Sequence, residues 1–222
     1  MNFSAHTFPL VLILSGPLWT APVNGAQSIV RPHLIVPASS IGKVQLGQGR
    51  AIVHQRMGQP FRSEVRKCSI VNLDSDGYNW RGKDMGQRLV DIWYRPVPSV
   101  ERKKIRPNGP WNSFEVLYQD GAVVQITIRL SGYKTKDNLD VNSTFQEFAK
   151  HYGGAGEASK SWFDLDPDRP AGSSHAMVWY WDFKKYGLTL ESELGHESDS
   201  PTVISALSIH RPKQSYLFNV VL

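Results

Sequence analysis

Two short segments of the chain share a pattern of apolar positions that predicts two similar helices. The pattern occurs in residues 46–60 and again in residues 141–155, displaced by 95 positions. In each segment two apolar side chains stand four apart and precede a glycine, which is typical of a short helix with one buried stripe and a glycine stop. These residues are Val53, Met57 and Gly58 in the first segment and Phe148, Tyr152 and Gly153 in the second. Thr144 and Glu147 have the spacing of a capping box, which supports helix initiation in the second segment.

Strands with alternating apolar side chains are predicted after each helix. A strand rich in Trp and Tyr comes first, at 91–94 in one unit and at 177–183 in the other. A hairpin then closes each unit, over 113–130 and over 187–210. In the second hairpin the alternation pairs residues of one strand with residues of the other, namely Leu188 and Leu190 with Leu207 and Ile209.

The parity of the apolar positions predicts the loop of the first hairpin. A two-residue turn would pair Val116 with Gln125 and place the apolar sets of the two strands on opposite faces. A three-residue loop over 119–121 pairs Val116 with Val124 and unites these sets on one face. Gly121 supplies the left-handed residue that such a loop needs. We therefore expect the three-residue loop.

Together these patterns predict an α+β fold made of two tandem repeats. Each repeat is a helix followed by three antiparallel strands, and the helices cover one face of a curved sheet. The first repeat spans residues 27–137 and contains a basic insertion at 61–110, and the second repeat spans residues 138–222. One such unit has few apolar residues to bury, so two units side by side make a better core.

The opening of the first repeat resembles a known family. Residues 41–47, Ile-Gly-Lys-Val-Gln-Leu-Gly, with Val53 and Met57-Gly58-Gln-Pro60, resemble the small exported domains related to the outer-membrane assembly lipoprotein E. The tandem architecture is similar to that of the β-lactamase inhibitory protein superfamily. The resemblance covers about 40–60 and 141–212, and it implies a secreted or periplasmic α+β protein that binds other proteins through its sheet and loops.

The first 26 residues predict export. They contain no Lys, Arg, Asp or Glu, and an apolar run at 8–19 has the size of a signal peptide. Asn24-Gly25-Ala26 offers a cleavage point before Gln27. The run is short for a membrane span and is interrupted by proline and glycine. We therefore expect a secreted or periplasmic protein, and the alternative is a membrane anchor formed by an uncleaved N-terminal segment.

Composition and charge narrow the class of protein and of partner. The chain has 222 residues, of which 41% are hydrophobic and 11% aromatic, so it can bury a substantial core. Its one cysteine excludes an intramolecular disulfide. The net charge of +5 divides into +9 over residues 27–137 and −4 over residues 138–222. Nucleic acid is the least expected partner, because export removes it, and no oligomeric state is predicted.

A basic run between prolines is a candidate contact for an anionic surface. Its cations follow Glu101 directly, and they are Arg102, Lys103, Lys104 and Arg106. They could hold a cell-wall polymer, lipid headgroups or an acidic protein. The alternative, which we favour, is a solvated loop or a loop that lies against the acidic second repeat.

A second candidate surface is the face of the sheet that points away from the helices. Alternation places Trp181 and Phe183 under a helix and Tyr180 and Asp182 on the opposite face. The residues expected on this open face are Trp93, Leu117, Tyr180, Asp182, Glu191, Glu193 and His210. Tyr and Trp on an open sheet are typical anchors of a protein or glycan interface. The alternative is that a further segment, such as 155–175, covers this face.

Catalytic chemistry has little support in the sequence. It contains no Gly-x-Ser-x-Gly elbow, phosphate loop or dinucleotide fingerprint, and its histidines lack the spacing of metal ligands. We therefore assign no catalytic residue, metal or cofactor. The alternative is an envelope hydrolase or metal-dependent enzyme in which His210 and Glu191 or Glu193 form an acid/base pair. The best-supported hypothesis is a non-enzymatic exported protein that binds a protein or an envelope polymer.

Overall fold

Strands form most of the structure. The computed structural model describes residues 33–73, 80–94, 112–153, 159–164, 177–194 and 204–221. These residues form a nine-stranded sheet, a four-stranded sheet and the two helices α1 and α3. The predicted α+β class is therefore confirmed, while the predicted signal segment, residues 1–26, lies outside the described residues.

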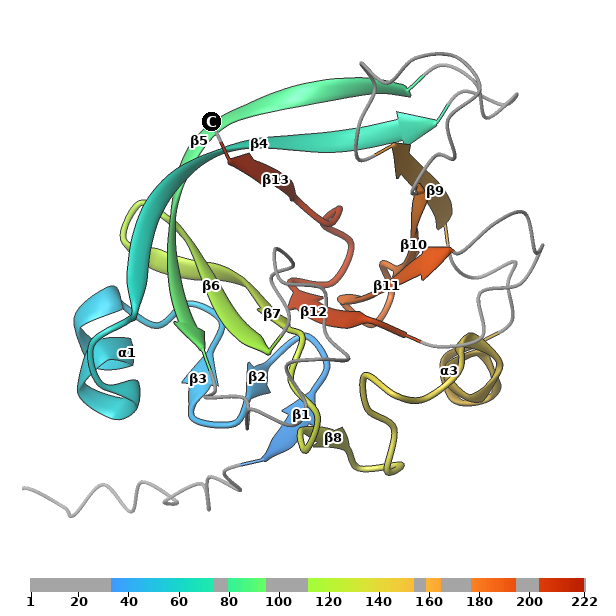
Figure 1. Cartoon of the computed structure of the whole chain (residues 1–222), viewed down its shortest axis with the longest axis horizontal. Coiled ribbons are helices and arrows are strands. Elements are labelled where there is room, and N and C mark those ends of the chain that lie inside the picture. The colour runs from blue at the N-terminus through green and yellow to red at the C-terminus, as the bar shows by residue number, and fades with distance from the viewer. Residues whose placement is uncertain are drawn as a thin grey trace, which may run out of the picture.

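The large sheet is antiparallel throughout, with the strand order β13-β4-β5-β6-β7-β12-β11-β10-β9. Helix α1 (Arg50–Met57) precedes β4 (Arg62–Leu73), β5 (Trp80–Tyr94), β6 (Ser113–Gln119) and β7 (Ala122–Ile128). Helix α3 (Phe145–Tyr152) precedes β9 (Ser159–Asp164), β10 (Met177–Phe183), β11 (Leu188–Leu194) and β12 (Ala206–His210), and β13 (Phe218–Val221) follows. The sheet curls so strongly that β4 and β9 come into contact, while β13 lies inside the curve (Figure 1).

The small sheet has the order β3-β2-β1-β8 and lies outside the curve of the large sheet (Figure 1). Its strands are β1 (Leu34–Val36), β2 (Ser40–Ile41), β3 (Val44–Gln45) and β8 (Lys134–Thr135). Strands β1 and β8 pair in parallel, although they are far apart in the sequence. This pairing ties the start of the described chain to the segment that leads into α3.

Both predicted helices are present, and both end where the sequence indicates. The helix α1 is followed by Gly58 at φ +81°, and α3 is followed by Gly153 at φ +100°. A side chain is disfavoured in this left-handed region, so glycine is suited to the stop. The capping box also forms, because Thr144 accepts from the backbone N–H of Glu147 and the Glu147 carboxylate accepts from the backbone N–H of Thr144.

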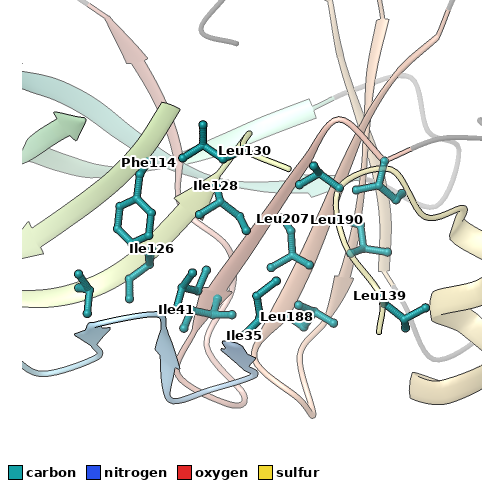
Figure 2. Packing of buried hydrophobic residues seen from close by; sticks show 14 of the residues in the cluster. Ile35, Ile41, Phe114, Ile126, Ile128, Leu130, Leu139, Leu188, Leu190 and Leu207 are labelled. Atoms are coloured by element: carbon teal, nitrogen blue, oxygen red, sulfur yellow. The ribbon is translucent and has the colours of Figure 1, made fainter. Parts of the chain in front are cut away.

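The main hydrophobic core lies between the large sheet and the elements outside its curve. We call this side of the large sheet the outer face. Val53 of α1 and Phe148 of α3 are fully buried against it. Figure 2 shows Ile35 and Ile41 of the small sheet beside Leu188 and other buried residues of the large sheet. The two helices and the small sheet therefore share one core.

The opposite side of the sheet, which we call the inner face, carries a smaller apolar cluster. Cys68, Val90, Ile92 and Leu117 form this inner cluster, and Leu217 packs against it. Leu217 belongs to residues 211–221, which follow β12, include β13 and lie inside the curve (Figure 1). We call residues 211–221 the C-terminal segment. Of the two alternatives for this face, open or covered by a further segment, the structure favours the covered one, and in the described chain the C-terminal segment covers it.

The pairings of the second hairpin are confirmed, but the loop predicted for the first hairpin is wrong. Leu188 pairs with Ile209 in the second hairpin. In the first hairpin Gln119 pairs with Ala122, which leaves a two-residue turn, and Val116 pairs with Ile126. The two-residue turn is compatible with the pairing of Val116 and Ile126 because the pairing of β6 with β7 shifts by one residue after the turn. This shift leaves Val124 as an extra residue, a β-bulge.

Two long strands occupy much of the predicted basic insertion at 61–110. Residues 62–73 and 80–94 form β4 and β5, so four strands of the large sheet follow α1 rather than three, and five follow α3. Glu64 and Arg66 of β4 point to the inner face, opposite Val90 and Arg88. These inward charges remove the apolar alternation by which a strand is recognised.

Candidate functional site

The inner face carries a row of polar side chains that runs across the middle of the sheet. Pairing places its members side by side on successive strands, in the order Glu115, Thr127, Ser208, Thr189 and Asp182. All five are buried. The hydroxyls of Thr127 and Ser208 lie 2.7 Å apart, and the Thr189 hydroxyl donates to Asp182 at 3.1 Å. Buried polar groups need such partners, and here they belong to neighbouring strands.

His210 completes this row at its acidic end. Its Nε2 lies 3.0 Å from Oδ1 of Asp182, and its Nδ1 lies 2.9 Å from the carbonyl oxygen of Arg211. Each ring nitrogen thus faces an oxygen atom, and the contact with Asp182 ties β12 to β10 within the buried row.

A network of charged side chains occupies the other end of the inner face. Arg66 donates to Glu115 at 2.9 Å, and Arg129 binds both oxygens of Glu191, at 2.9 and 2.7 Å. Arg129 also lies 3.6 Å from Glu115, so it bridges the two carboxylates. The network joins β4 and β6 to β11 through Arg129, which directly follows β7.

The two carboxylates of this network differ in how firmly they hold their charge. Burial acts to raise the pKa of Glu115, but Arg129 and Arg66 outweigh it, and the pKa lies below its usual value. Burial also raises the pKa of Glu191, and here Arg129 does not compensate for it, so the pKa lies above its usual value. Glu191 is therefore the carboxylate that protonates first.

The C-terminal segment closes the inner face through its backbone. The N–H of Leu217 donates to Oε1 of Gln125 at 2.9 Å, and Nε2 of Gln125 donates to the Leu217 carbonyl at 3.2 Å. The N–H of Tyr216 donates to Oδ2 of Asp182 at 3.2 Å. The ring of Tyr216 stacks on Tyr180, with centroids 5.6 Å apart. Burial raises the pKa of Tyr216, so its phenol stays neutral.

The structure brings together Tyr180, Asp182 and His210 of the predicted surface, but it buries them. Glu191 lies on the same face but opposite Ala206, four residues from His210. Four residues of strand span about 13 Å, and Glu191 binds Arg129 while His210 binds Asp182, so the expected acid/base pair of these two side chains is not formed.

Leu117, also predicted for this surface, does lie on the inner face, where it is buried in the inner cluster. Trp93 pairs with Phe114 and lies on the outer face. The prediction that these two residues share one surface is wrong, because Trp93 faces α1 and donates to the carbonyl of Gly58 at 3.3 Å. The side chain of Glu193 and the basic residues 102–106 lie outside the described residues.

A second polar cluster, on the outer face beneath α1, was not anticipated from the sequence. Asp91 is fully buried and accepts two hydrogen bonds from Arg50, both at 2.8 Å. It also accepts from Ser63 at 2.6 Å and lies 2.7 Å from Nε2 of His54. Arg50 and His54 are four apart on a helix, a spacing that places both on one face and could have indicated a shared acidic partner.

Large apolar side chains are exposed at the corner where α1, the start of β4 and the end of β5 meet (Figure 1). Phe61 is 78% exposed, and its ring stands edge to face against Tyr94 with the centroids 5.1 Å apart. Val65 of β4 is also exposed, but the strand pairing places it and Tyr94 on opposite faces of the sheet. Arg62, which follows Phe61, is exposed and forms an ion pair with Glu64. We call Phe61 and Tyr94 the corner patch.

Metal and thiol chemistry find no support within the described ranges. No group of three His, Cys, Asp or Glu side chains there could hold a metal ion. Cys68 is buried, and burial raises the pKa of its thiol, so it is not an activated nucleophile. Among the helices that the structure describes, none has the length and apolar character needed to cross a membrane.

Comparisons of the chain with protein-family models, with curated protein sequences and with solved structures find no match.

Proposed function

We propose that this chain is an exported, non-enzymatic binding protein that contacts a protein partner through the corner patch. The observation that carries the proposal is Phe61, an aromatic side chain that is 78% exposed and whose ring is held against Tyr94. A large apolar group held in water by a second ring is the kind of anchor that dominates protein interfaces. Arg62 beside it is already paired with Glu64, so the patch favours a partner that offers an apolar pocket rather than an acidic surface.

The chemistry of the inner face supports a binding role over catalysis. His210 and Asp182 are paired with one another, and both oxygens of Glu191 are held by Arg129. His210 and Asp182 are buried, and the side chain of Glu191 is only 12% exposed. A general base must reach the proton that it abstracts, and these groups have no such access in this arrangement.

The tandem repeat belongs to the same proposal. We infer two related units, residues 27–137 and 138–222. The helices α1 and α3 each have eight residues, start 95 positions apart and end at a glycine with positive φ. Four strands of the large sheet follow α1, and their order β4-β5-β6-β7 is mirrored by the first four strands after α3, β12-β11-β10-β9, about the β7–β12 pair. The resemblance to the exported assembly and inhibitor domains implies the same architecture.

Export is supported by the charge-free first 26 residues and their apolar run. The N-terminal mass of the protein recovered from its producing cells tests this expectation. A mature chain that starts near Gln27 is expected. A chain that retains residues 1–26 and stays in the cytoplasm would exclude export.

Site-specific photocrosslinking tests the corner patch. Phe61 is replaced by p-benzoylphenylalanine, and the matched control carries the same group at Val36, which is exposed on β1 away from the patch. We expect irradiation of the producing cells to give one discrete adduct from position 61 and none from position 36. The adduct should weaken when Tyr94→Ala is added, because the ring that packs against position 61 is then lost. Equal adducts at both positions, or none at position 61, would refute the corner patch as a binding surface.

A further inference from the structure

We propose that the inner face of the large sheet is a binding site for an extended polypeptide, and that residues 214–221 of this chain occupy it in the structure. In a site of this kind, polar groups bind the backbone of the peptide, and apolar contacts select its side chains. Both features are present on the inner face. The proposal concerns a surface different from the corner patch, so it stands or falls independently of the proposed function.

Gln125 recognises the backbone of the occupant. This side chain is 1% exposed, and its amide binds both the N–H and the C=O of Leu217, at 2.9 and 3.2 Å. An amide that pairs with a peptide group in this way imitates the pairing between two strands and does not depend on the side chain it meets. Without an occupant, both ends of the Gln125 amide would lose these partners. Loss of either hydrogen bond is expected to weaken binding of the occupant several-fold.

Asp182 makes the neighbouring backbone contact. Its Oδ2 accepts from the N–H of Tyr216 at 3.2 Å, while its Oδ1 is held by His210 and Thr189. The carboxylate is thus fixed by the polar row, with its second oxygen presented to a main-chain donor. The backbones of Tyr216 and Leu217 are thus bound by two fixed side chains, Asp182 and Gln125, and this defines the direction of the bound strand.

Apolar contacts select the side chains of the occupant. Tyr216 stacks on Tyr180 at an interplanar angle of 30°, and the next residue, Leu217, packs on the inner cluster. Residues 218–221 then pair with β4 as an added antiparallel strand. The site therefore fits an aromatic residue followed by an aliphatic one and then a short extended stretch, which is strand addition at a sheet edge.

The occupant can be separated from the rest of the fold for two reasons. The main core, with α1, α3 and the small sheet, lies on the outer face and does not include the C-terminal segment. A short exposed turn links β12 to the occupant, and its residues are Arg211, Pro212 and Lys213. Loss of the occupant leaves the outer core intact, so a matching segment of a partner can take its place.

An exchange experiment on the full chain tests the proposal. A protease site is inserted between Lys213 and Gln214, and the folded protein is cut there. A fluorescein-labelled peptide of residues 214–222 is then added, and its anisotropy is followed. We expect the labelled peptide to displace the cut segment and bind saturably, whereas a scrambled peptide should not bind. The uncut protein should bind the peptide at least about tenfold more weakly, because its own segment is tethered.

Matched variants link the binding to the proposed contacts. Gln125→Leu should weaken peptide binding about tenfold, and Gln119→Leu, at an exposed position of β6, should leave it unchanged. If the cut protein unfolds when the segment leaves, or keeps the segment until it is denatured, residues 214–221 are a fixed part of the fold and the proposal is wrong. An uncut Tyr216→Ala, Leu217→Ala variant gives a second test. It should take up the labelled peptide more readily than the natural chain, and a folded variant that takes up none would overturn the proposal.

Discussion

At the scale of single residues, Asp91 shows how one buried carboxylate positions a whole helix. It is placed on the outer face by β5, and Arg50 and His54 reach it from successive turns of α1. Helix α1 has glycine at its N-cap and no side-chain cap, so its own sequence gives it little stability. The hydrogen bonds to Asp91 therefore fix α1 on the sheet, beside the corner patch.

We expect Asp91→Asn to destabilise the protein in a manner that depends on pH. Burial acts to raise the pKa of Asp91, but its three side-chain partners outweigh burial and lower it from 3.8 to about 2. A lowered pKa stabilises the folded state above pH 4, and this contribution fades as the pH falls toward 2. The natural chain should therefore exceed the variant by about 2 kcal/mol at pH 7. Urea unfolding at pH 7 and pH 3 measures the difference.

The control for Asp91→Asn is Asp120→Asn, at an exposed turn position with φ +51° that asparagine also tolerates. This control should change the free energy of unfolding by no more than about 0.5 kcal/mol. A gap between the natural chain and Asp91→Asn that stays constant from pH 7 to pH 3 would contradict the assignment of the charge to Asp91.

Gly187 provides a second prediction at this scale. It has φ +57°, and a Cβ added to it would collide with the carbonyl oxygen of His210 and lie 3.2 Å from the Cβ of Ala38. Gly187→Ala should therefore cost more than about 3 kcal/mol, because the backbone of β12 must move. Gly58→Ala meets no atom within 4 Å, so it should cost less, about 1–2 kcal/mol of backbone strain at φ +81° and ψ −177°. Equal costs in thermal unfolding would show that strain alone decides both.

At the scale of elements, the first hairpin shows that alternation specifies a face more firmly than it specifies a loop. The apolar pattern correctly predicted that Val116 and Ile126 share one face. Two loops satisfy that requirement, a three-residue loop or a two-residue turn followed by a bulge. Asp120 and Gly121 both have positive φ, as the tight turn requires, and Val124 is the extra residue. The bulge sends Val124 to the inner cluster.

Deletion of Val124 should consequently be tolerated. It removes the bulge and leaves the pairing of Leu117 with Gln125 and of Tyr118 with Val123 unchanged. The expected cost is about 1–2 kcal/mol for the lost packing of one side chain. Deletion of Val116, in the regular partner strand, inverts the residues before it and should prevent folding. Circular dichroism and urea unfolding of both variants test this, and an unfolded Val124 deletion would show that the bulge is required.

Other elements show where the sequence loses its predictive power. The helices were predicted because a buried stripe and a glycine stop are local features, and the capping box of Thr144 is local as well. Strand β4 was missed because Glu64 and Arg66 face inward, so it lacks apolar alternation. The C-terminal segment was missed as the cover of the inner face because Gln125 binds a backbone 92 positions away, and no side-chain pattern marks that contact.

At the scale of the whole molecule, the two faces of the large sheet serve different purposes. The outer face joins α1, α3 and the small sheet in one apolar core. The inner face is polar across the seam between β7 and β12, where Thr127 contacts Ser208. Replacing buried ion pairs by apolar groups is often neutral or stabilising, so a polar inner face adds little to stability. It instead leaves groups that can recognise a main chain, as residues 214–221 illustrate.

The ion network across this seam predicts which of its two carboxylates stabilises the fold through its charge. Arg129 bridges Glu115 of β6 and Glu191 of β11, and the two carboxylates are buried to a similar degree. The pKa of Glu115 is lowered, so its ionised form stabilises the fold above the ordinary pKa. The pKa of Glu191 is raised, so its contribution is present at low pH and is lost as the pH rises through the folded pKa. Glu115→Gln should therefore be the more costly variant at pH 7.

Urea unfolding of the two isosteric variants at pH 7 and pH 5 separates these contributions. Glu115→Gln removes a charge that Arg66 and Arg129 both use, and a loss of about 3 kcal/mol is expected at pH 7. Glu191→Gln keeps an acceptor for Arg129 and relieves an unfavourable buried charge, so it should cost less than about 1 kcal/mol at pH 7. Lowering the pH to 5 should make Glu191→Gln relatively worse, because the natural Glu191 then holds its proton. The reverse order at pH 7 would mean that Arg129 stabilises the fold more through Glu191 than through Glu115. The ion pair of Arg129 with Glu191, which crosses the β7–β12 seam, would then be the more important one.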